Sequence, residues 1–280
     1  MNLAMPSIEI LEEFGTQIRL HALDMVSKGN SSHIACVFSI ADILAVLYGA
    51  ILKKDPKNPN WNERDRFLLS KGHAGAGVYA ALALSGYFEE TVLATHCKNG
   101  SKLSGHISHK GVPGVEFSSG SLGHGLPVAC GMAYTGKLEK KEHNVYVVLG
   151  DGECNEGSVW EAALFASHHR LDHLYVIVDT NGMQSLKSTN ETLDLTPFPD
   201  KWKSFGWEVR QVDGHDISAL LTAFSPSIDK KPVCIIANTI KGKGVSFMEK
   251  NILWHYRPPQ GADLEKARFE LSKMSTDHEI

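Results

Sequence analysis

The stretch from residue 144 to 185 constrains the fold most, because it alternates apolar runs with glycine turns. Residues 145–149 form a short β-branched and aromatic run, typical of a strand buried on both faces of a parallel sheet. Residues 157–170 have the apolar periodicity of a helix, and residues 174–178 form a second apolar run. The order strand, helix, strand predicts a βαβ unit with its crevice at the carboxyl ends of the strands.

Polar side chains follow both predicted strands of this unit. Asp151 stands between two glycines directly after the first strand, and Asn181 follows the second. Because the carboxyl ends of neighbouring parallel strands lie side by side, we expect both side-chain oxygens to reach one point. With a backbone carbonyl near Met183 they suit Mg²⁺, which takes few ligands from protein and the rest from phosphates and water. Either residue alone is more typical of an ordinary turn, so the prediction depends on the pair.

The composition excludes several classes of protein. The 280 residues are 42% hydrophobic and 21% charged, which is ordinary for a globular protein. With 28 basic and 32 acidic residues and no basic run, the chain is predicted not to bind nucleic acid. No signal sequence or window of roughly 18 apolar residues is present, so we expect a cytoplasmic protein without membrane association. The five cysteines are widely spaced, which predicts free thiols and no zinc site.

The remaining patterns predict an α/β fold, an open and mostly parallel sheet of five or six strands with helices on both faces. Further strands are expected at residues 67–70, 207–212 and 233–238. Helices are expected at 7–28, at 39–52 with Ser39 as the cap, and at 217–224. One more helix is expected to end at Leu84, and another to begin near Leu122.

Three segments of the chain have no regular apolar pattern or carry unexpected glycines. Residues 98–120 are irregular and rich in glycine and serine, and a stretch of this length is usually functional in a compact domain. The helix from near Leu122 carries glycines that cost about 1 kcal/mol each in a helix interior, which indicates close approach of another group. We expect a single domain over residues 1–280, with an irregular tail from about residue 241.

Histidines occur in several of the predicted turns and loops. His33 lies between two predicted helices, His73 in a glycine turn after a strand, His106 in the irregular segment and His255 in the tail. On these residues alone, each is also explained as a surface, capping or turn residue. Imidazoles have pKa values near neutrality, so a cluster of them would suit proton movements at substrate hydroxyls.

The sequence GDG, followed thirty positions after its aspartate by the asparagine of DTNGM, resembles the thiamine diphosphate motif of transketolases. The similarity extends from about residue 10 to 260. It implies that Asp151, Asn181 and the carbonyl of Met183 ligate Mg²⁺, and that Gly152 lies against the diphosphate. Thr180 stands where the family usually has asparagine or aspartate, a position that does not ligate the metal.

The histidines also match this family. His33 and His73 correspond to histidines of an SGHPG-like loop and a KGHA-like turn, and His106 to a substrate-facing histidine. His255 follows KGKG and matches a histidine near the diphosphate and the substrate. The resemblance implies catalytic roles for all four, with His73 and His255 also contacting the cofactor.

Two further segments are assigned by the resemblance. The loop GSLGHG matches a GPLGQG loop whose backbone lies along the cofactor, which implies cofactor contacts for Gly120, Ser121 and Leu122. Glu156 matches a glutamate at a dimer interface near both cofactors. An exposed acidic residue at a helix N-terminus, favoured by the helix dipole, explains Glu156 equally well. The VDGHD stretch at residues 212–216 is assigned to packing or a turn.

The resemblance covers only the diphosphate-binding domain of the family. The pyrimidine-binding domain, which supplies the glutamate that activates the cofactor, has no counterpart here. The resemblance therefore implies the N-terminal subunit of a split transketolase that uses thiamine diphosphate and Mg²⁺ to transfer a two-carbon ketol unit from a ketose phosphate to an aldose. Its partner would carry the pyrimidine-binding and C-terminal domains, in an α2β2 assembly.

Two alternatives stay open at this point. The first is another thiamine diphosphate-dependent transferase, either a pathway-specific transketolase for a modified sugar or an enzyme similar to deoxyxylulose-phosphate synthase. The second is a non-catalytic regulatory half. The retention of Asp151, Asn181 and the four histidines argues against the second, because a chain without metal binding has no reason to keep that combination.

Overall fold

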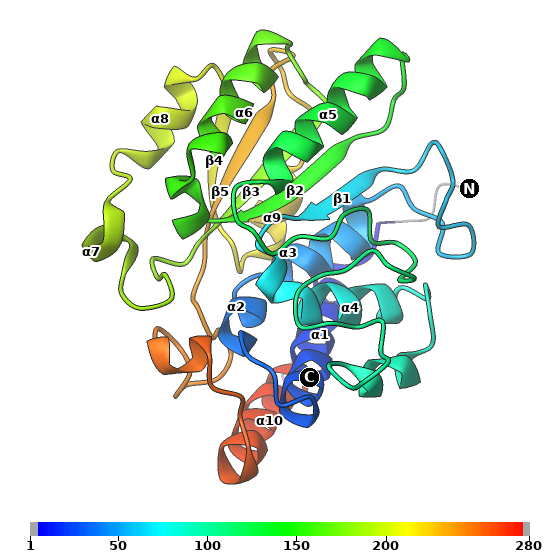
Figure 1. Ribbon diagram of the computed structural model, residues 1–280, viewed down its shortest axis with the longest axis vertical. Coiled ribbons are helices and arrows are strands. Elements are labelled where there is room, and N and C mark those ends of the chain that lie inside the picture. Colours follow the sequence, from blue (N-terminus) through cyan, green and yellow to red (C-terminus); the bar gives the residue numbers. More distant parts are fainter. Residues whose placement is uncertain (1–4, 277–280) are drawn as a thin grey trace.

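The sheet consists of five parallel strands flanked by helices, as Figure 1 shows for this computed structural model, which describes residues 5–276. The strand order is β1-β2-β3-β5-β4, and each neighbouring pair is parallel. The strands are β1 (Arg66–Leu69), β2 (Val145–Gly150), β3 (Leu174–Thr180), β4 (Glu208–Asp213) and β5 (Val233–Asn238). The predicted α/β class and all predicted strands are confirmed. The predicted domain limits, residues 1 and 280, lie outside the described residues.

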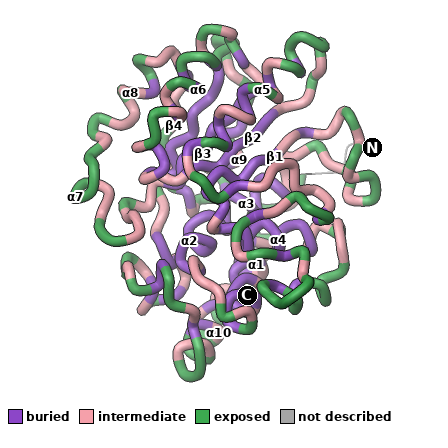
Figure 2. The backbone as a smooth tube through the Cα atoms, viewed as in Figure 1, coloured by how far each residue is buried: buried purple, intermediate pink, exposed green. Residues whose placement is uncertain are grey.

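Alternate side chains of each strand enter two separate cores, because successive residues of a strand point to opposite faces. On β2, Tyr146 and Val148 face one core, and Val147 and Leu149 face the other. The first core is covered by α1 (Ile8–Lys28), α2 (Ile34–Phe38), α3 (Ala41–Val46), α4 (Gly75–Leu84), α9 (Ile217–Ala223) and α10 (Gly261–Thr276). The second is covered by α5 (Gly125–Leu138), α6 (Gly157–His168) and α8 (Phe198–Ser204). The strands β1, β2, β3 and β5 are therefore mostly buried, as Figure 2 shows, whereas the edge strand β4 and α7 (Thr189–Leu193) have no buried residue.

The predicted helix over residues 39–52 is confirmed for residues 41–51, but the prediction that Ser39 caps it was wrong. The chain forms α2 before Ser39 and α3 after it, followed by a π-helical turn from Leu47 to Ile51. The Ser39 hydroxyl, which has one hydrogen to donate, lies 2.8 Å from Asp179 Oδ2 and 3.0 Å from the Cys36 carbonyl, and the ionised carboxylate is the stronger acceptor. A long-range bond to β3 has thus replaced the expected local cap, and the break between α2 and α3 lies at Ile40, which has no side-chain cap bond.

The prediction of an irregular tail from about residue 241 was also wrong for its last part. A short 3₁₀ turn (Ile252–His255) is followed by the sixteen-residue helix α10, which packs against α1. Ala267 and Leu271 are fully buried in the first core. They lie four residues apart, on one face of a helix, and this short apolar stripe among charged residues was overlooked in the sequence.

The carboxyl ends of the strands meet at one edge of the sheet, as expected for a parallel sheet. Lys71, Asp151, Asn181 and Thr239 follow β1, β2, β3 and β5 there. The 3₁₀ turn lies across the start of α2, since the His33 backbone amide donates to the His255 carbonyl at 2.8 Å. Within residues 5–276, no helix is both long and apolar enough to span a bilayer.

Candidate active site

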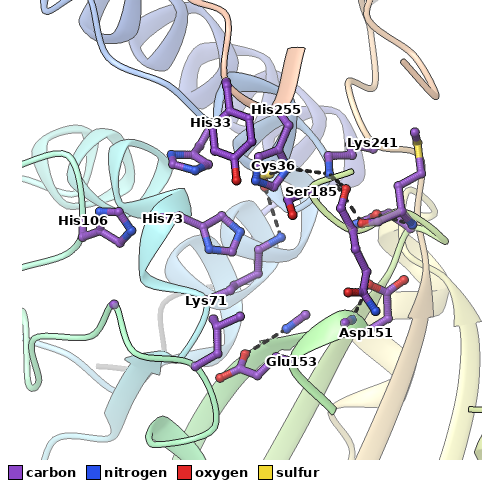
Figure 3. Close-up of a pocket in the computed structure, with 18 residues that line it drawn as sticks. His33, Cys36, Lys71, His73, His106, Asp151, Glu153, Ser185, Lys241 and His255 are labelled. Atoms are coloured by element: carbon purple, nitrogen blue, oxygen red, sulfur yellow. Dashed lines mark hydrogen bonds between the residues drawn. The ribbon is translucent and has the colours of Figure 1, made fainter. Parts of the chain in front are cut away.

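A cavity of about 260 Å³ lies at the carboxyl ends of β1, β2 and β3. It brings together ten of the twelve residues that the sequence singled out, and Figure 3 shows the histidines on one side and Asp151 on the other. The ten are His33, His73, His106, Gly120, Leu122, Asp151, Gly152, Asn181, Met183 and His255. Sequence reasoning missed the other lining residues, which are Cys36, Lys71, Gly150, Glu153, Gln184, Ser185, Lys241 and Tyr256.

Two predicted site residues do not line this cavity. Ser121 is exposed in the glycine loop, and Glu156 is exposed at the start of α6. The Glu156 side chain instead lies close to Gly123. A Cβ atom added to Gly123 would lie only 2.6 Å from the Cβ atom of Glu156. The cofactor roles of both residues stay predictions.

The two predicted metal-binding turns are hydrogen-bonded to each other. Asp151 accepts from the Gly152 amide through Oδ1 and from the Gly182 amide through Oδ2, each at 2.7 Å. Asn181 Oδ1 accepts from the Met183 amide at 3.1 Å. The carboxylate keeps further lone pairs, because two ionised oxygens offer about four acceptor positions.

The electrostatics around Asp151 favour the binding of a cation. Burial, together with the nearby carboxylate of Asp179, raises the pKa of Asp151 to about 6. A hard cation beside Asp151 would offset the cost of this buried negative charge. No group of three or more His, Cys, Asp or Glu side chains within residues 5–276 is placed to hold a metal. A metal at Asp151 therefore needs amide and carbonyl oxygens, and the residues present fit that requirement.

We call the side of the cavity with Asp151, Asn181 and Met183 the metal wall, and the side with His33, His73, His106 and His255 the histidine wall. A buried ion pair connects the two. Asp179 is fully buried on β3 and pairs with Lys71, which follows β1. The same carboxylate accepts hydrogen bonds from Asn181 Nδ2 at 2.9 Å and from the Thr239 hydroxyl. Burial alone would lower the pKa of Lys71, but the Asp179 carboxylate outweighs it and the net pKa is raised. Both residues were missed because each follows or ends an apolar run with no local sign of its partner.

The four predicted histidines form one cluster around His33. The His33 ring centroid lies 5.1 Å from that of His73, 5.6 Å from His106 and 4.9 Å from His255. Burial lowers the pKa of His33 to about 4 and that of His255 to about 3, with nearby Lys241 adding to both effects. Burial also holds the pKa of His73 well below its usual range. These three imidazoles are therefore neutral at neutral pH.

The glycine loop is fixed by a buried carboxylate, Glu153. Glu153 accepts hydrogen bonds from the Ser70 hydroxyl, the Gly123 amide at 2.9 Å and the Gly150 amide at 3.1 Å. A Cβ atom on Gly125 would lie 2.3 Å from Ser70 Oγ. The close approach expected of the glycines near the start of α5 is thus an approach to protein atoms at Gly123 and Gly125, whereas a Cβ atom on Gly131 would meet nothing within 4 Å.

Comparisons with known proteins agree with this arrangement. The sequence profile described as the transketolase thiamine diphosphate binding domain matches residues 11–276. The SqwG subunit of a 6-deoxy-6-sulfo-D-fructose transketolase from Clostridium sp. (strain MSTE9) is 42% identical over 88% of this chain and 90% of that protein. One subunit of an apulose-4-phosphate transketolase from Phocaeicola vulgatus is 38% identical over 95% of each chain.

A solved structure of transketolase from Campylobacter jejuni has a TM-score of 0.89 and 33% sequence identity. It matches 95% of this chain, but the chain spans only 43% of the C. jejuni protein. The resemblance found in the sequence is confirmed: this chain belongs to the transketolase family, as an N-terminal subunit built from its thiamine diphosphate-binding domain.

Proposed function

We propose that this chain is the diphosphate-binding subunit of a two-chain transketolase that requires thiamine diphosphate and Mg²⁺. In this proposal the assembled enzyme transfers a two-carbon ketol unit from a ketose phosphate to an aldose. The observation that supports it most is a single cavity in which oxygen atoms around Asp151 face a cluster of histidines that includes the neutral rings of His33 and His255. Neither wall alone would distinguish a transketolase from other metal-binding α/β proteins.

The metal wall would hold the metal ion and the diphosphate of the cofactor. Asp151, Asn181 and the Met183 carbonyl are the proposed Mg²⁺ ligands, and phosphate oxygens and water would complete the shell. Thiamine diphosphate, when bound, supplies an electron sink for a carbanion. The proposed contacts to it come from both walls and the glycine loop: His73, Gly120, Ser121, Leu122, Gly152, Glu156, Asn181 and His255.

The histidine wall would bind the sugar and exchange protons with its hydroxyls. A neutral imidazole has one donor and one acceptor nitrogen, so each ring is able both to orient a hydroxyl and to take up its proton. His33, His73, His106 and His255 carry this role in our proposal. Burial lowers the pKa of His33, His73 and His255 and so keeps these three rings uncharged.

A second chain is part of this proposal, and its support comes from relatives that are themselves named as subunits of transketolases. Two relatives that are named as transketolase subunits have nearly the same extent as this chain. We propose a partner with the pyrimidine-binding and C-terminal domains, an α2β2 assembly, and a cytoplasmic location. Both relatives are named for modified sugars, so a modified ketose is the second substrate class to test.

The test begins with the tagged chain purified from its native cells and with mass spectrometry of any protein that co-purifies stoichiometrically. We expect one chain of similar or slightly larger size. The pair is then assayed with thiamine diphosphate, Mg²⁺ and a panel of donors: a common ketose phosphate, a sulfonated ketose, a branched ketose phosphate and pyruvate. Turnover of pyruvate only would favour the synthase-like alternative, and a stoichiometric pair with no turnover would favour the regulatory one.

A further inference from the structure

The turn between β4 and α9, which carries the VDGHD stretch, holds the segment that follows β5. The Gly214 amide donates to the Asn238 carbonyl at 2.8 Å, and a Cβ atom on Gly214 would lie only 2.4 Å from Thr239 Cγ2. The next residue, His215, accepts a hydrogen bond of 2.8 Å from the Ile240 amide through Nε2. Two neighbouring residues of the turn thus bind the backbone of the segment after β5 at two places.

The protonation of the His215 ring follows from its contacts. A backbone amide nitrogen donates and does not accept, so Nε2 of His215 is the acceptor and the proton of the ring is on Nδ1. Nδ1 lies 2.7 Å from Asp42 Oδ2 and donates this proton to it. The side chain of His215 is only 9% exposed. The ring therefore connects a buried carboxylate to the Ile240 amide.

Asp42, on α3, is itself held by Arg19 on α1. The guanidinium of Arg19 donates to both carboxylate oxygens of Asp42, at 2.7 and 2.6 Å. Burial alone would raise the pKa of Asp42, but the charge of Arg19 and the hydrogen bonds outweigh it and the net pKa is lowered. The carboxylate is therefore ionised at neutral pH. Because a bidentate pair has a defined geometry, the partner of the His215 ring has a fixed position.

The segment after β5 also borders the cavity. The Thr239 hydroxyl donates to Asp179, the carboxylate that accepts from Asn181 Nδ2. Lys241 lines the cavity. Ile240 lies between Thr239 and Lys241, so the position of its amide determines where both of these residues lie. A displaced Ile240 would move the Thr239 hydroxyl away from the carboxylate that orients Asn181.

We propose that His215 is a positioning residue for the metal wall. It ties residues 239–241 to the carboxylate of Asp42 and so keeps the Thr239 hydroxyl on Asp179. His215 does not line the cavity, so it acts through this segment and not on a ligand. The tie stands on the hydrogen bonds alone. Its consequence, tighter binding of the metal ion and the cofactor diphosphate, rests on the function proposed above.

Amide hydrogen exchange of the full chain tests the tie without any variant. Mass spectrometry of fragments that resolve the Ile240 amide gives its exchange rate. We expect this amide to exchange far more slowly than an unstructured peptide, because its acceptor is a buried ring nitrogen. Exchange as fast as that of an unstructured peptide would overturn the proposal.

Two variants of His215 separate the two ends of the ring. The amide nitrogen of asparagine takes about the place of Nδ1 and keeps the bond to Asp42, whereas the amide oxygen of glutamine takes about the place of Nε2 and keeps the bond to Ile240. We expect the Ile240 amide to exchange about tenfold faster in His215→Asn and nearly as in wild type in His215→Gln.

The amides of β2 are the internal reference for these variants, because a general loss of stability would also accelerate their exchange. No acceleration at Ile240 in His215→Asn, or an equal acceleration at Ile240 and in β2, would contradict the tie.

The effect on the metal wall is measured by calorimetry of thiamine diphosphate and Mg²⁺ binding to the enzyme assembled with its partner. We expect His215→Asn to bind the cofactor about tenfold more weakly and His215→Gln to bind it nearly as tightly as wild type. His173→Asn is the matched control. Its ring contacts Asn144 Oδ1 at 2.9 Å, at the opposite end of β3 from the cavity, and its loss should leave the affinity unchanged.

Wild-type affinity in a His215→Asn enzyme with faster exchange at Ile240 would overturn the role of His215 at the metal wall. If the wild-type assembly binds no thiamine diphosphate, the proposed function fails and this role fails with it. The tie between His215 and Ile240 is then still decided by the exchange rates of the chain itself.

Discussion

The buried carboxylate of Asp179 accepts a hydrogen bond of 2.9 Å from the side-chain amide of Asn181. Because the side-chain nitrogen of Asn181 donates to this carboxylate, the side-chain oxygen of Asn181 is the atom left to ligate the proposed metal ion. The carboxylate also pairs with Lys71, so one buried charge on β3 connects the metal wall to the segment after β1 that carries His73. The two halves of the site are therefore held in register by one side chain.

Replacing Asp179 by asparagine should destabilise the chain by about 3 kcal/mol or more, because it leaves the Lys71 ammonium buried without a counter-charge. The measurement is urea unfolding. The double variant with Lys71→Met should recover part of this loss, since it removes the unpaired charge. Wild-type stability for Asp179→Asn alone would show that the pair contributes little.

Asp151→Ala should abolish the Mg²⁺-dependent binding of thiamine diphosphate to the assembled enzyme, since it removes the only carboxylate of the proposed donor set. Isothermal calorimetry with and without Mg²⁺ measures the effect. Asp200→Ala, at an exposed position on α8, is the control and should bind normally. Unchanged affinity in Asp151→Ala would refute the metal assignment.

His106→Ala should reduce turnover by about a hundredfold while leaving cofactor affinity unchanged, because His106 lies on the histidine wall, away from Asp151. The matched control is His109→Ala, three residues further on, whose ring contacts Ser118 and does not line the cavity. Turnover at the wild-type rate in His106→Ala would remove this residue from the substrate site.

The buried histidines predict that the chain loses stability as the pH falls below about 6.5. The pKa of His33 is about 4 in the folded chain, lower than in the unfolded chain, because burial penalises its charged form. Between pH 6.5 and 4 the unfolded chain therefore binds protons that the folded chain does not, and the free energy of unfolding decreases as the pH is lowered.

Urea unfolding at a series of pH values measures this dependence. His33→Asn should show a smaller decrease than wild type between pH 6.5 and 4, since it removes one such group. An identical pH dependence in the two proteins would mean that His33 titrates normally in the folded chain.

The strands and the strand-end residues were predictable because their signals are local. An apolar run such as 145–149 is typical of a strand that is buried on both faces. A polar residue that follows the run closely, such as Asp151, is then expected at the end of the strand, on the edge of the sheet. The histidines were predicted from the resemblance, since their loop sequences alone are equally compatible with surface positions.

The interactions that hold the site together were not predictable in the same way. Lys71 and Asp179 are 108 residues apart, and neither carries a local mark of a buried ion pair. Ser39 looked like a helix cap, but its hydroxyl bonds to Asp179 across the fold. Lys241 was part of a recognised KGKG segment, yet its contact with His255 depends on a turn fourteen residues away. Such partners are determined by the packed structure and not by spacing in the sequence.

Two-carbon transfer by purified chains is the most direct test of the proposed function. The rate is measured with a ketose phosphate donor and an aldose acceptor for this chain alone, for its co-purifying partner alone, and for the two mixed. We expect no transfer by either chain alone, and transfer by the mixture that requires both thiamine diphosphate and Mg²⁺. A mixture that binds the cofactor but transfers nothing from any donor, or transfer that persists without Mg²⁺, would contradict the proposal.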